Sequence, residues 1–266
     1  NQSVTITINE NESTPVVTLA TSATTIAENA GSSLTLTATL SVATTEDVIV
    51  ALGTAGTGTE GTDYSTISDI TVSAGQTTGT VSFTPTDDNV YEGNETAVVS
   101  ISTVSGGSAN ESGTPQEVTI TISENESAPT VTLTSSASSI AENAGSSLTL
   151  TATLSVATTA DVTVSIDGTG GTATEGTDFG TVSDITISAG ATTGTTSFTP
   201  TDDSIYDATS NETAGISVSA VSGGGASENG NQAVTITITD NESAPTLTLS
   251  TSASSISEDA GSSLTI

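Results

Sequence analysis

The segment Ile26–Thr45 reads IAENAGSSLTLTATLSVATT, and the same letters return without a change at 140–159. Inside it, Leu34, Leu36 and Leu40 alternate with threonines. Successive side chains of a β-strand point to opposite faces, so this period of two predicts a strand with one buried face. The same alternation recurs along the chain, and no stretch shows the period of about 3.6 residues that is typical of a helix. The sequence therefore predicts an all-β fold.

The repeated segment is part of a longer internal repeat. Glu28, Glu142 and Glu258 occupy equivalent places, 114 and 116 residues apart. A Gly-Thr-Asp motif recurs in step, followed by Tyr64 in one copy and by Phe179 in the next. A period of this length suits a whole sandwich domain better than one coil of a solenoid. We therefore divide the chain into the last strand of a preceding repeat (1–12), two complete repeats (13–126 and 127–242) and the start of a following repeat (243–266).

Each complete repeat is expected to hold about seven strands, because clusters of Gly, Asn, Asp and Ser separate the alternating stretches. In the first repeat we expect strands near 16–20 (with 24–27), 33–41, 47–52, 67–73, 78–84, 96–104 and 116–123. Their number and length favour two packed antiparallel sheets. The aromatic residues of this repeat are Tyr64, Phe83 and Tyr91, and we expect them in the core or at its corners.

The composition excludes several function classes. The chain has no Lys, Arg, His or Cys and carries 31 acidic residues, which gives a net charge of -31. Nucleic acid is excluded as a partner, because a phosphate backbone needs clustered cations. Most catalytic bases and nucleophiles are absent, so we do not expect an enzyme. Paired carboxylates such as Asp87 and Asp88 could in principle act as acid and base on a glycoside. The chain has no tryptophan on which a sugar could stack, which argues against this option. No apolar run reaches the length of a membrane span.

The acidic residues avoid the strands and collect in loops. In a sandwich of seven strands, alternate loops emerge at the same end, and the acid-rich loops of the first repeat are those of one end. Carboxylates at this density repel one another unless a cation lies between them. Calcium takes six to eight oxygen ligands and is the usual cation outside cells, so we expect calcium as the cofactor. The alternative is a solvated acidic surface, as on a halophilic protein.

Several spaced elements of each repeat resemble the Calx-beta domain, a module named from sodium–calcium exchangers and repeated in large bacterial surface proteins. In the first repeat these elements are 26–31 (IAENAG), 61–64 (GTDY), 87–95 (DDNVYEGNE) and 120–126 (ITISENE). The resemblance covers each full repeat and implies an immunoglobulin-like sandwich that holds calcium at one end.

The resemblance also implies the metal ligands. In the first repeat they are Glu28, Asp63, Asp87, Asp88, Glu92, Glu95, Glu124 and Glu126. In the second repeat they are Glu142, Asp178, Asp202, Asp203, Asp207, Glu212, Asp240 and Glu242. The second repeat departs from the first by extra residues between Asp207 and Glu212.

These observations favour a structural function. We expect a calcium-rigidified stalk or filament segment of an extracellular bacterial adhesin or surface fibre. Its partners would be the neighbouring repeats of the same chain, with self-association into a fibre as a further option. The alternative is a binding module that recognises a glycan or a cell-surface protein through its loops. Six Asn-Glu-Ser/Thr sequences fit the glycosylation pattern, but they also recur simply because the loops recur.

Overall fold

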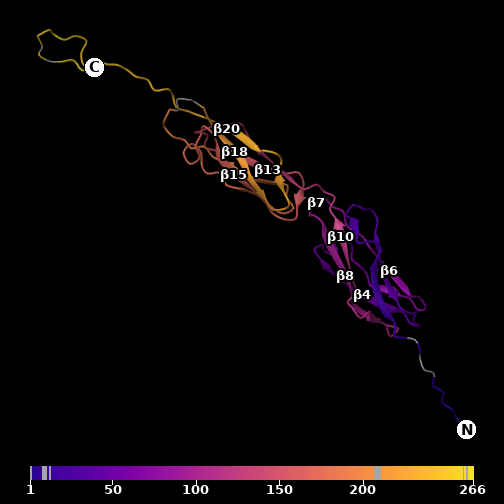
Figure 1. Ribbon diagram of the computed structural model, residues 1–266. Coiled ribbons are helices and arrows are strands. Elements are labelled where there is room, and N and C mark those ends of the chain that lie inside the picture. Colours follow the sequence, from indigo (N-terminus) through magenta and orange to yellow (C-terminus); the bar gives the residue numbers. More distant parts are fainter. Residues whose placement is uncertain (1, 8–10, 12, 207–210, 260, 262) are drawn as a thin grey trace.

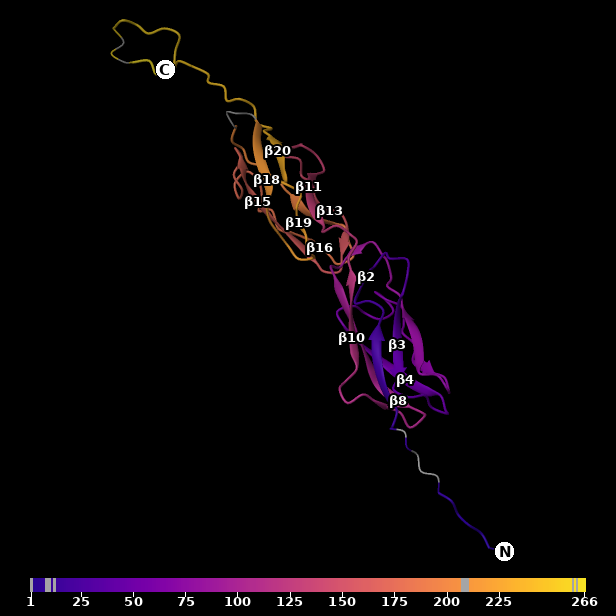
Figure 2. The ribbon, with the colours of Figure 1, turned by 45° about the vertical axis from the view of Figure 1, so that its right-hand side comes forward.

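The computed structural model describes residues 2–7, 11, 13–206, 211–259, 261 and 263–266. The described residues form two β-sandwiches that follow one another along the chain (Figures 1 and 2). The predicted all-β class is confirmed, and the described residues contain no helix that is long and apolar enough to cross a membrane.

The first sandwich is built from two sheets. Its strands are β1 (Val16–Thr21), β2 (Thr25–Ala27), β3 (Leu34–Leu40), β4 (Val48–Gly56), β5 (Ile70–Val72), β6 (Thr78–Phe83), β7 (Val90–Tyr91), β8 (Glu95–Ser105), β9 (Asn110–Glu111) and β10 (Glu117–Ser123). One sheet has the order β6-β3-β1-β9 and the other the order β2-β10-β8-β4-β5. The sequence does not predict the two-residue strands β7 and β9.

The second sandwich repeats this arrangement. Its strands are β11 (Thr130–Ser135), β12 (Ser139–Ala141), β13 (Leu148–Leu154), β14 (Ala157–Thr158), β15 (Val162–Gly171), β16 (Ile185–Ile187), β17 (Thr193–Phe198), β18 (Asn211–Ser222), β19 (Ser227–Glu228) and β20 (Ala233–Thr239). The sheet orders are β17-β13-β11-β19 and β12-β20-β18-β15-β16. The strand β14 lies outside both sheets and pairs with β7 of the first sandwich.

Alternation along the strands creates the two cores. In β3, Leu36, Ala38 and Leu40 are buried while the threonines between them are more exposed. The rings of Tyr64 and Phe83 stack at a centroid distance of 4.9 Å in the first core, and those of Phe179 and Phe198 lie at the same distance, tilted by 31°, in the second. Tyr91 is an exception to the sequence expectation, because it lies in β7 at the end of the sandwich and is only partly buried.

The first alternating stretch of each repeat divides between the two sheets, which decides where the acidic loops lie. β1 pairs antiparallel with β3, whereas β2 crosses to the other sheet and pairs parallel with β10. Because β2 and β10 run in the same direction, the residues that follow them emerge together. The backbone N–H of Glu28 donates to the carbonyl of Ser123 at 3.0 Å, and Glu142 repeats this bond to Thr239 at 3.1 Å.

Gly56 ends β4 where the chain turns into the acidic loop that contains Asp63. Its φ of +118° lies in the region that favours glycine, and a Cβ there would stand 2.1 Å from the carbonyl oxygen of Thr96. This close approach anchors the loop beside the start of β8, so that Asp63 and Glu95 face the same end of the sandwich.

The two outer segments of the chain contain no strand among their described residues. Residues 2–7 were expected in the last strand of a preceding repeat, but Val4 and Ile6 are exposed and unpaired by any strand. Leu247 and Leu249, in the expected start of a following repeat, are also exposed. A strand needs a row of backbone hydrogen bonds to a neighbour. In the second segment the N–H of Ser252 donates to the carbonyl of Thr265 at 3.0 Å, which is not enough to define a strand. The division of the chain at 13–126 and 127–242 stays a prediction.

Candidate metal centre

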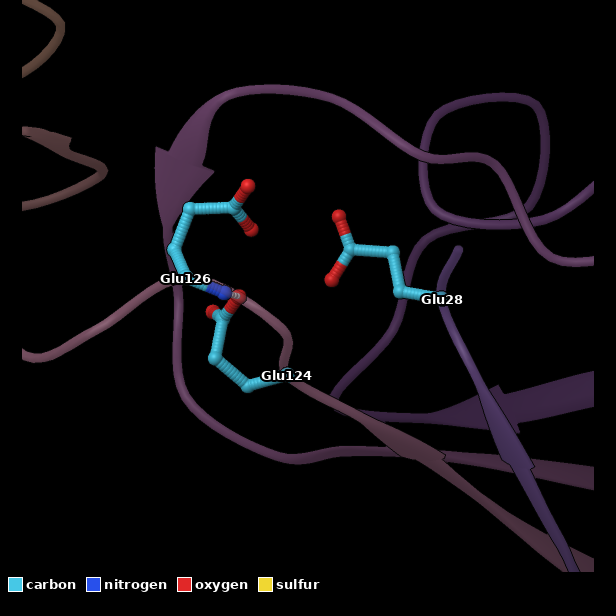
Figure 3. Close-up of side chains that lie close together, drawn as sticks. All are labelled: Glu28, Glu124 and Glu126. Carbon is cyan, nitrogen blue, oxygen red and sulfur yellow. Dashed lines mark hydrogen bonds between the residues drawn. The ribbon is translucent and has the colours of Figure 1, made fainter. Parts of the chain in front are cut away.

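The acidic pole of the first sandwich, defined by the loops that carry Glu28, Asp63, Glu92, Glu95 and the segment 124–126, contains two carboxylate clusters. In the first cluster Glu28, Glu124 and Glu126 each offer an oxygen, and these three oxygens lie within 4.8 Å of one another. Figure 3 shows the side chains of Glu28 and Glu126 pointing toward each other, with Glu124 beside them. Glu28 follows β2 and Glu124 follows β10, so the parallel pairing of these strands creates this cluster.

Backbone amides hold the Glu124 carboxylate in place. Its Oε2 accepts hydrogen bonds from the N–H groups of Glu92 at 2.6 Å and Gly93 at 2.8 Å, and its Oε1 accepts from Asn125 and Glu126, both at 2.9 Å. Burial by itself raises the pKa of Glu124, but these amides outweigh it and hold the pKa below its ordinary value. Glu124 is therefore a fixed, ionised carboxylate around which the loops are organised.

In the other two members of this cluster, Glu28 and Glu126, the surroundings disfavour the ionised form of the carboxyl group. Burial raises the pKa of Glu28, and the nearby charges of Glu124 and Asp88 raise it further, although the amide of Asp88 opposes them. Contact with the Glu124 carboxyl raises the pKa of Glu126 to about 6, with desolvation as the next cause. Three carboxyl groups thus converge where no cationic side chain exists to balance them.

The second cluster of this pole consists of Asp63, Glu92 and Glu95, whose nearest oxygens also lie within 4.8 Å of one another. The backbone N–H of Thr59 donates to Asp63 at 2.5 Å and fixes that side chain. Burial, followed by repulsion from Asp63 and Glu92, raises the pKa of Glu95 to about 7. Burial is also the main cause that raises the pKa of Glu92.

The second sandwich contains one such cluster among its described residues, formed by Glu142, Asp203 and Glu242. The side chain of Asp240 accepts a hydrogen bond from the N–H of Glu242 at 2.7 Å and so orients the exit segment. Contact with Glu142 raises the pKa of Glu242 to about 7, and desolvation and Asp240 add to this rise.

Three carboxylate oxygens of these clusters are buried and accept no hydrogen bond: Oε2 of Glu126, Oε1 of Glu142 and Oε2 of Glu242. A buried carboxylate oxygen without a partner is costly, and a bound cation removes that cost. The donors are all hard oxygens, which suit calcium or magnesium better than zinc or copper. The residues of both poles therefore fit a hard divalent cation.

The remaining predicted ligands do not join these three clusters. Asp87 and Asp88 are exposed; the amide of Asp88 donates to Glu28, and its carboxylate accepts from the N–H of Val90 at 2.7 Å. The carboxylate of Asp178 accepts from the N–H of Thr174 at 2.7 Å, as Asp63 does in the first sandwich. Two further predicted ligands lie outside the trio of the second sandwich: Asp202 lines a small hollow together with Glu142, and Glu212 is the second residue of β18. Asp207 lies outside the described residues.

Two polar side chains of the acidic loops have structural contacts. Glu60 accepts hydrogen bonds from the N–H of Ile67 at 2.7 Å and from the hydroxyl of Thr54 at 2.9 Å, so it closes its own loop. Asn94, which stands in an Asn-Glu-Thr sequence, accepts from the N–H of Glu124 at 3.0 Å. The recurrence of this asparagine thus has a structural reason independent of glycosylation.

The acidic pole of the first sandwich adjoins the second sandwich, and we call the connection the joint: segment 124–130 together with the pair β7–β14. The carbonyl of buried Pro129 accepts from the N–H of Ser227 at 3.0 Å, and the N–H of Thr130 donates to Ser155 at 2.9 Å. In the pair β7–β14, Tyr91 lies opposite Thr158. Sequence reasoning missed the contribution of Tyr91, which it assigned to the core or corners of its own sandwich.

The raised pKa values predict how the metal-free protein responds to pH. The carboxyls of Glu95, Glu126 and Glu242 bind protons more tightly in the folded than in the unfolded state, where the ordinary value is 4.5. Their contribution to stability is complete below about pH 4.5 and is lost as the pH rises to about 7. The lowered pKa of Glu124 has the opposite effect on stability. Its contribution is lost as the pH falls below about 4.5, outside the window in which the other three groups act.

We therefore expect metal-free protein to unfold at lower urea concentration at pH 8 than at pH 5. Saturating calcium should flatten or reverse this trend, because the ion favours the ionised carboxylates. If the urea midpoint of the metal-free protein increases from pH 5 to pH 8, the pKa values of these carboxyls are not raised in the folded state.

Comparison with known proteins identifies the fold. The Calx-beta domain profile matches residues 10–126 and again 124–242. No curated protein sequence matches the chain. Among solved structures, CBD12 from CALX1.2 is 14% identical with a TM-score of 0.37, over 83% of this chain and 99% of that chain. The apo-form Calx CBD1 domain is 18% identical with a TM-score of 0.36, over 42% and 99%. Invasin, a bacterial integrin-binding protein, is 17% identical with a TM-score of 0.40, over 85% and 40%.

Proposed function

Because this chain belongs to the Calx-beta family, with two domains of that family in tandem, we propose that it is a calcium-stiffened structural segment of an extracellular surface protein. The observation that carries the proposal is the place of the first carboxylate cluster. Glu124 and Glu126 belong to the segment that joins the two sandwiches, whereas Glu28 belongs to the body of the first sandwich. One cation held by all three would tie the joint to that body.

Calcium is the cation that we propose. Its bonds to oxygen are about 2.3–2.6 Å long, and it accepts irregular sets of carboxylate, carbonyl and water oxygens, whereas magnesium demands a near-octahedral set. Glu28, Glu124 and Glu126 would hold an ion in the first cluster, and Asp63, Glu92 and Glu95 a second ion beside it. In the second sandwich Glu142, Asp203 and Glu242 would do the same.

Stiffness would follow from the position of these sites at the joint. Without metal, the carboxylates of Glu28 and Glu126 repel each other, which favours movement of the exit segment away from the sandwich. With calcium, bending the joint would stretch metal–oxygen bonds. Repetition of such joints would produce a rod suited to a stalk or filament of an adhesin or surface fibre.

The alternative expectation, a module that binds glycans through its loops, has less support. Tyr64, Phe83, Phe179 and Phe198 are buried in the cores, and Tyr91 lies in the joint. Tyr206 is the sixth and last aromatic residue of the chain, so the loops offer no row of rings on which sugars could stack.

Small-angle scattering of the intact chain tests the proposal. We expect a larger maximum dimension and a narrower distribution of shapes in calcium than after chelation. Replacing Glu124 and Glu126 with glutamine should make the calcium sample resemble the chelated one. A matched control is Glu117→Gln, an exposed carboxylate on β10 outside both clusters. Equal dimensions of wild type and variant under both conditions would refute calcium stiffening.

A further inference from the structure

One Asn-Glu-Ser/Thr sequence is present in the first repeat and absent from the second. The others stand at equivalent places of successive repeats, as those of Asn94 and Asn211 do. Residues 110–112 read Asn-Glu-Ser, whereas residues 227–229, which have the same strand register in the second sandwich, read Ser-Glu-Asn. Repetition of the loops therefore explains the other sequences but not this one.

The backbone of this segment is the same in both sandwiches, although the side chains differ. The N–H of Asn110 donates to the carbonyl of Pro15 at 3.0 Å. The N–H of Ser227 donates to the carbonyl of Pro129 at the same distance. A serine thus replaces the asparagine without a change in the strand, so the fold does not require an asparagine at this place.

The middle residue of the segment is the one with a structural contact. The carboxylate of Glu111 accepts a hydrogen bond from the N–H of Gln116 at 2.5 Å, and Glu228 accepts the equivalent bond from Gln232. Both sandwiches keep this glutamate, whereas the residues on either side of it differ. The asparagine and the serine that complete the glycosylation pattern are therefore the two residues that the fold leaves free to vary.

The side chain of Asn110 is exposed and makes no hydrogen bond within the part of the chain that the structure describes. Other asparagines of this pattern have contacts at the joint. Asn94 accepts the N–H of Glu124 at 3.0 Å, and the amide of Asn125 donates to Glu126 at 3.0 Å. Substitution of the Asn110 amide would therefore disturb no contact, unlike substitution of the Asn125 amide.

A preceding repeat would not cover Asn110 if it docked as the first sandwich docks on the second. The Tyr91 ring of the first sandwich packs on Gly225, two residues before Ser227. Ser227 is nevertheless exposed in the presence of this contact. Because Ser227 is the equivalent of Asn110, this position stays open at an end of a sandwich that a neighbouring repeat occupies.

The local structure also gives a modifying enzyme access to the segment. β9 is two residues long and stands last in the sheet order β6-β3-β1-β9, so a group attached to an exposed side chain extends away from the sheet. The loop residues 113–115 that follow are exposed. A short edge strand beside an exposed loop opens at low cost.

We propose that Asn110 is an N-glycosylation site, with a lipid-linked oligosaccharide as the sugar donor. In the transfer, Nδ2 of Asn110 forms a bond to the anomeric carbon of the first sugar, and the bond from that carbon to the donor's diphosphate breaks. Nδ2 gives one proton to a base of the transferase, and the lipid diphosphate leaves with the bonding electron pair. This modification rests on the extracellular location in the proposed function, but it needs no calcium.

Mass spectrometry of the protein isolated from the cells that make it tests this site. Thermolysin, which cleaves at apolar residues, replaces trypsin because the chain has no Lys or Arg. Asn125 is the internal control, since residues 125–127 are also Asn-Glu-Ser and any preference of the transferase for the tripeptide is the same. We expect a sugar mass on the peptide that contains Asn110 and none on the peptide that contains Asn125.

Variants made in the same cells identify the modified atom. Asn110→Gln and Ser112→Ala should each lose the whole added mass, whereas Ser112→Thr should keep it, because threonine also completes the acceptor pattern. These variants should fold, since Ser227 and Asn229 stand at the equivalent places. A bare Asn110 in the native protein overturns the inference. Added mass that persists in Ser112→Ala, or equal occupancy of Asn125, does so too.

Protease treatment of intact cells separates failure of this inference from failure of the proposed function. Release of peptides of this chain shows that it lies outside the cell. A bare Asn110 on a protein that is released in this way contradicts glycosylation alone. A bare Asn110 on a protein that stays protected in intact cells contradicts the extracellular location as well.

Discussion

Calcium should raise the melting temperature of this protein by roughly 10–20 °C over that of the chelated protein. An ion that binds only the folded state contributes about 4 kcal/mol at a concentration a thousand times its dissociation constant. For a domain of this size 1 kcal/mol corresponds to a few degrees. The physical cause is local, because the ion gives the unpartnered oxygens of Glu126, Glu142 and Glu242 a ligand and cancels the repulsion between converging carboxylates.

The variant that tests this expectation is the pair Glu28→Gln with Glu142→Gln, which removes the most buried carboxylate of one cluster in each sandwich. It should lose the part of the calcium-induced increase that these two clusters supply, and the ion at Asp63, Glu92 and Glu95 should supply the remainder. Its chelated form should melt no lower than chelated wild type, because two repelling charges are gone. The control Glu117→Gln should keep the full increase. Identical melting of wild type in calcium and chelator would reject the metal sites. Full stabilisation by sodium chloride alone would instead support the halophilic interpretation.

The strands and the location of the acids were open to prediction from sequence, because both depend on local patterns. The period of two in 34–40 identifies a half-buried strand, and its side chains alternate in burial as predicted. The family and its tandem arrangement followed from spaced motifs and are confirmed by the match at 10–126 and 124–242. The pairing of aromatic rings such as Tyr64 with Phe83 agrees with their expected place in the core.

The composition of each cluster was less accessible, because it depends on contacts distant in sequence. Glu28 lies beside Glu124 only because β2 pairs in parallel with β10. No local sequence pattern predicts this strand pairing. Asp88 stays a predicted ligand, and its carboxylate also accepts the N–H of Val90 and so shapes the turn before β7. Predicting ligands by residue type alone cannot separate these two roles.

Tyr91 shows a different limit of sequence reasoning. An aromatic residue in a repeat with few others is most simply assigned to the core of its own sandwich. The ring of Tyr91, however, packs on Gly225, which belongs to the next repeat. The reason for a glycine at this position is seen only when the two surfaces are in contact. The signal available in the sequence was the position of Val90 and Tyr91 in an acidic loop, outside any alternating stretch.

The joint should lose its fixed geometry when Tyr91 is replaced by alanine, even in saturating calcium. The ion cluster ties segment 124–126 to the first sandwich, but the direct contact between the sandwiches comes from β7 on β14, where Tyr91 covers Gly225. Removal of a large aromatic side chain from such a contact costs on the order of 2 kcal/mol or more. The calcium sites should survive, since Tyr91 belongs to neither carboxylate cluster.

Spin labels on two introduced cysteines can measure this effect. Thr80 and Thr195 are equivalent, exposed positions in the middle of β6 and β17, one on each sandwich. In calcium the wild-type protein should give one narrow distribution of label distances, and chelation should broaden it. The variant Tyr91→Ala should give a broad distribution in calcium while keeping the calcium-induced increase in melting temperature.

The matched control is Tyr206→Ala, which removes the equivalent ring of the second sandwich, outside this joint. It should leave the distribution narrow. If Tyr91→Ala also stays as narrow as wild type in calcium, the metal alone holds the two sandwiches and the aromatic contact adds nothing. If wild type is equally narrow after chelation, the aromatic contact alone is sufficient, and the acids at the joint serve the stability of each sandwich and not the stiffness of the rod.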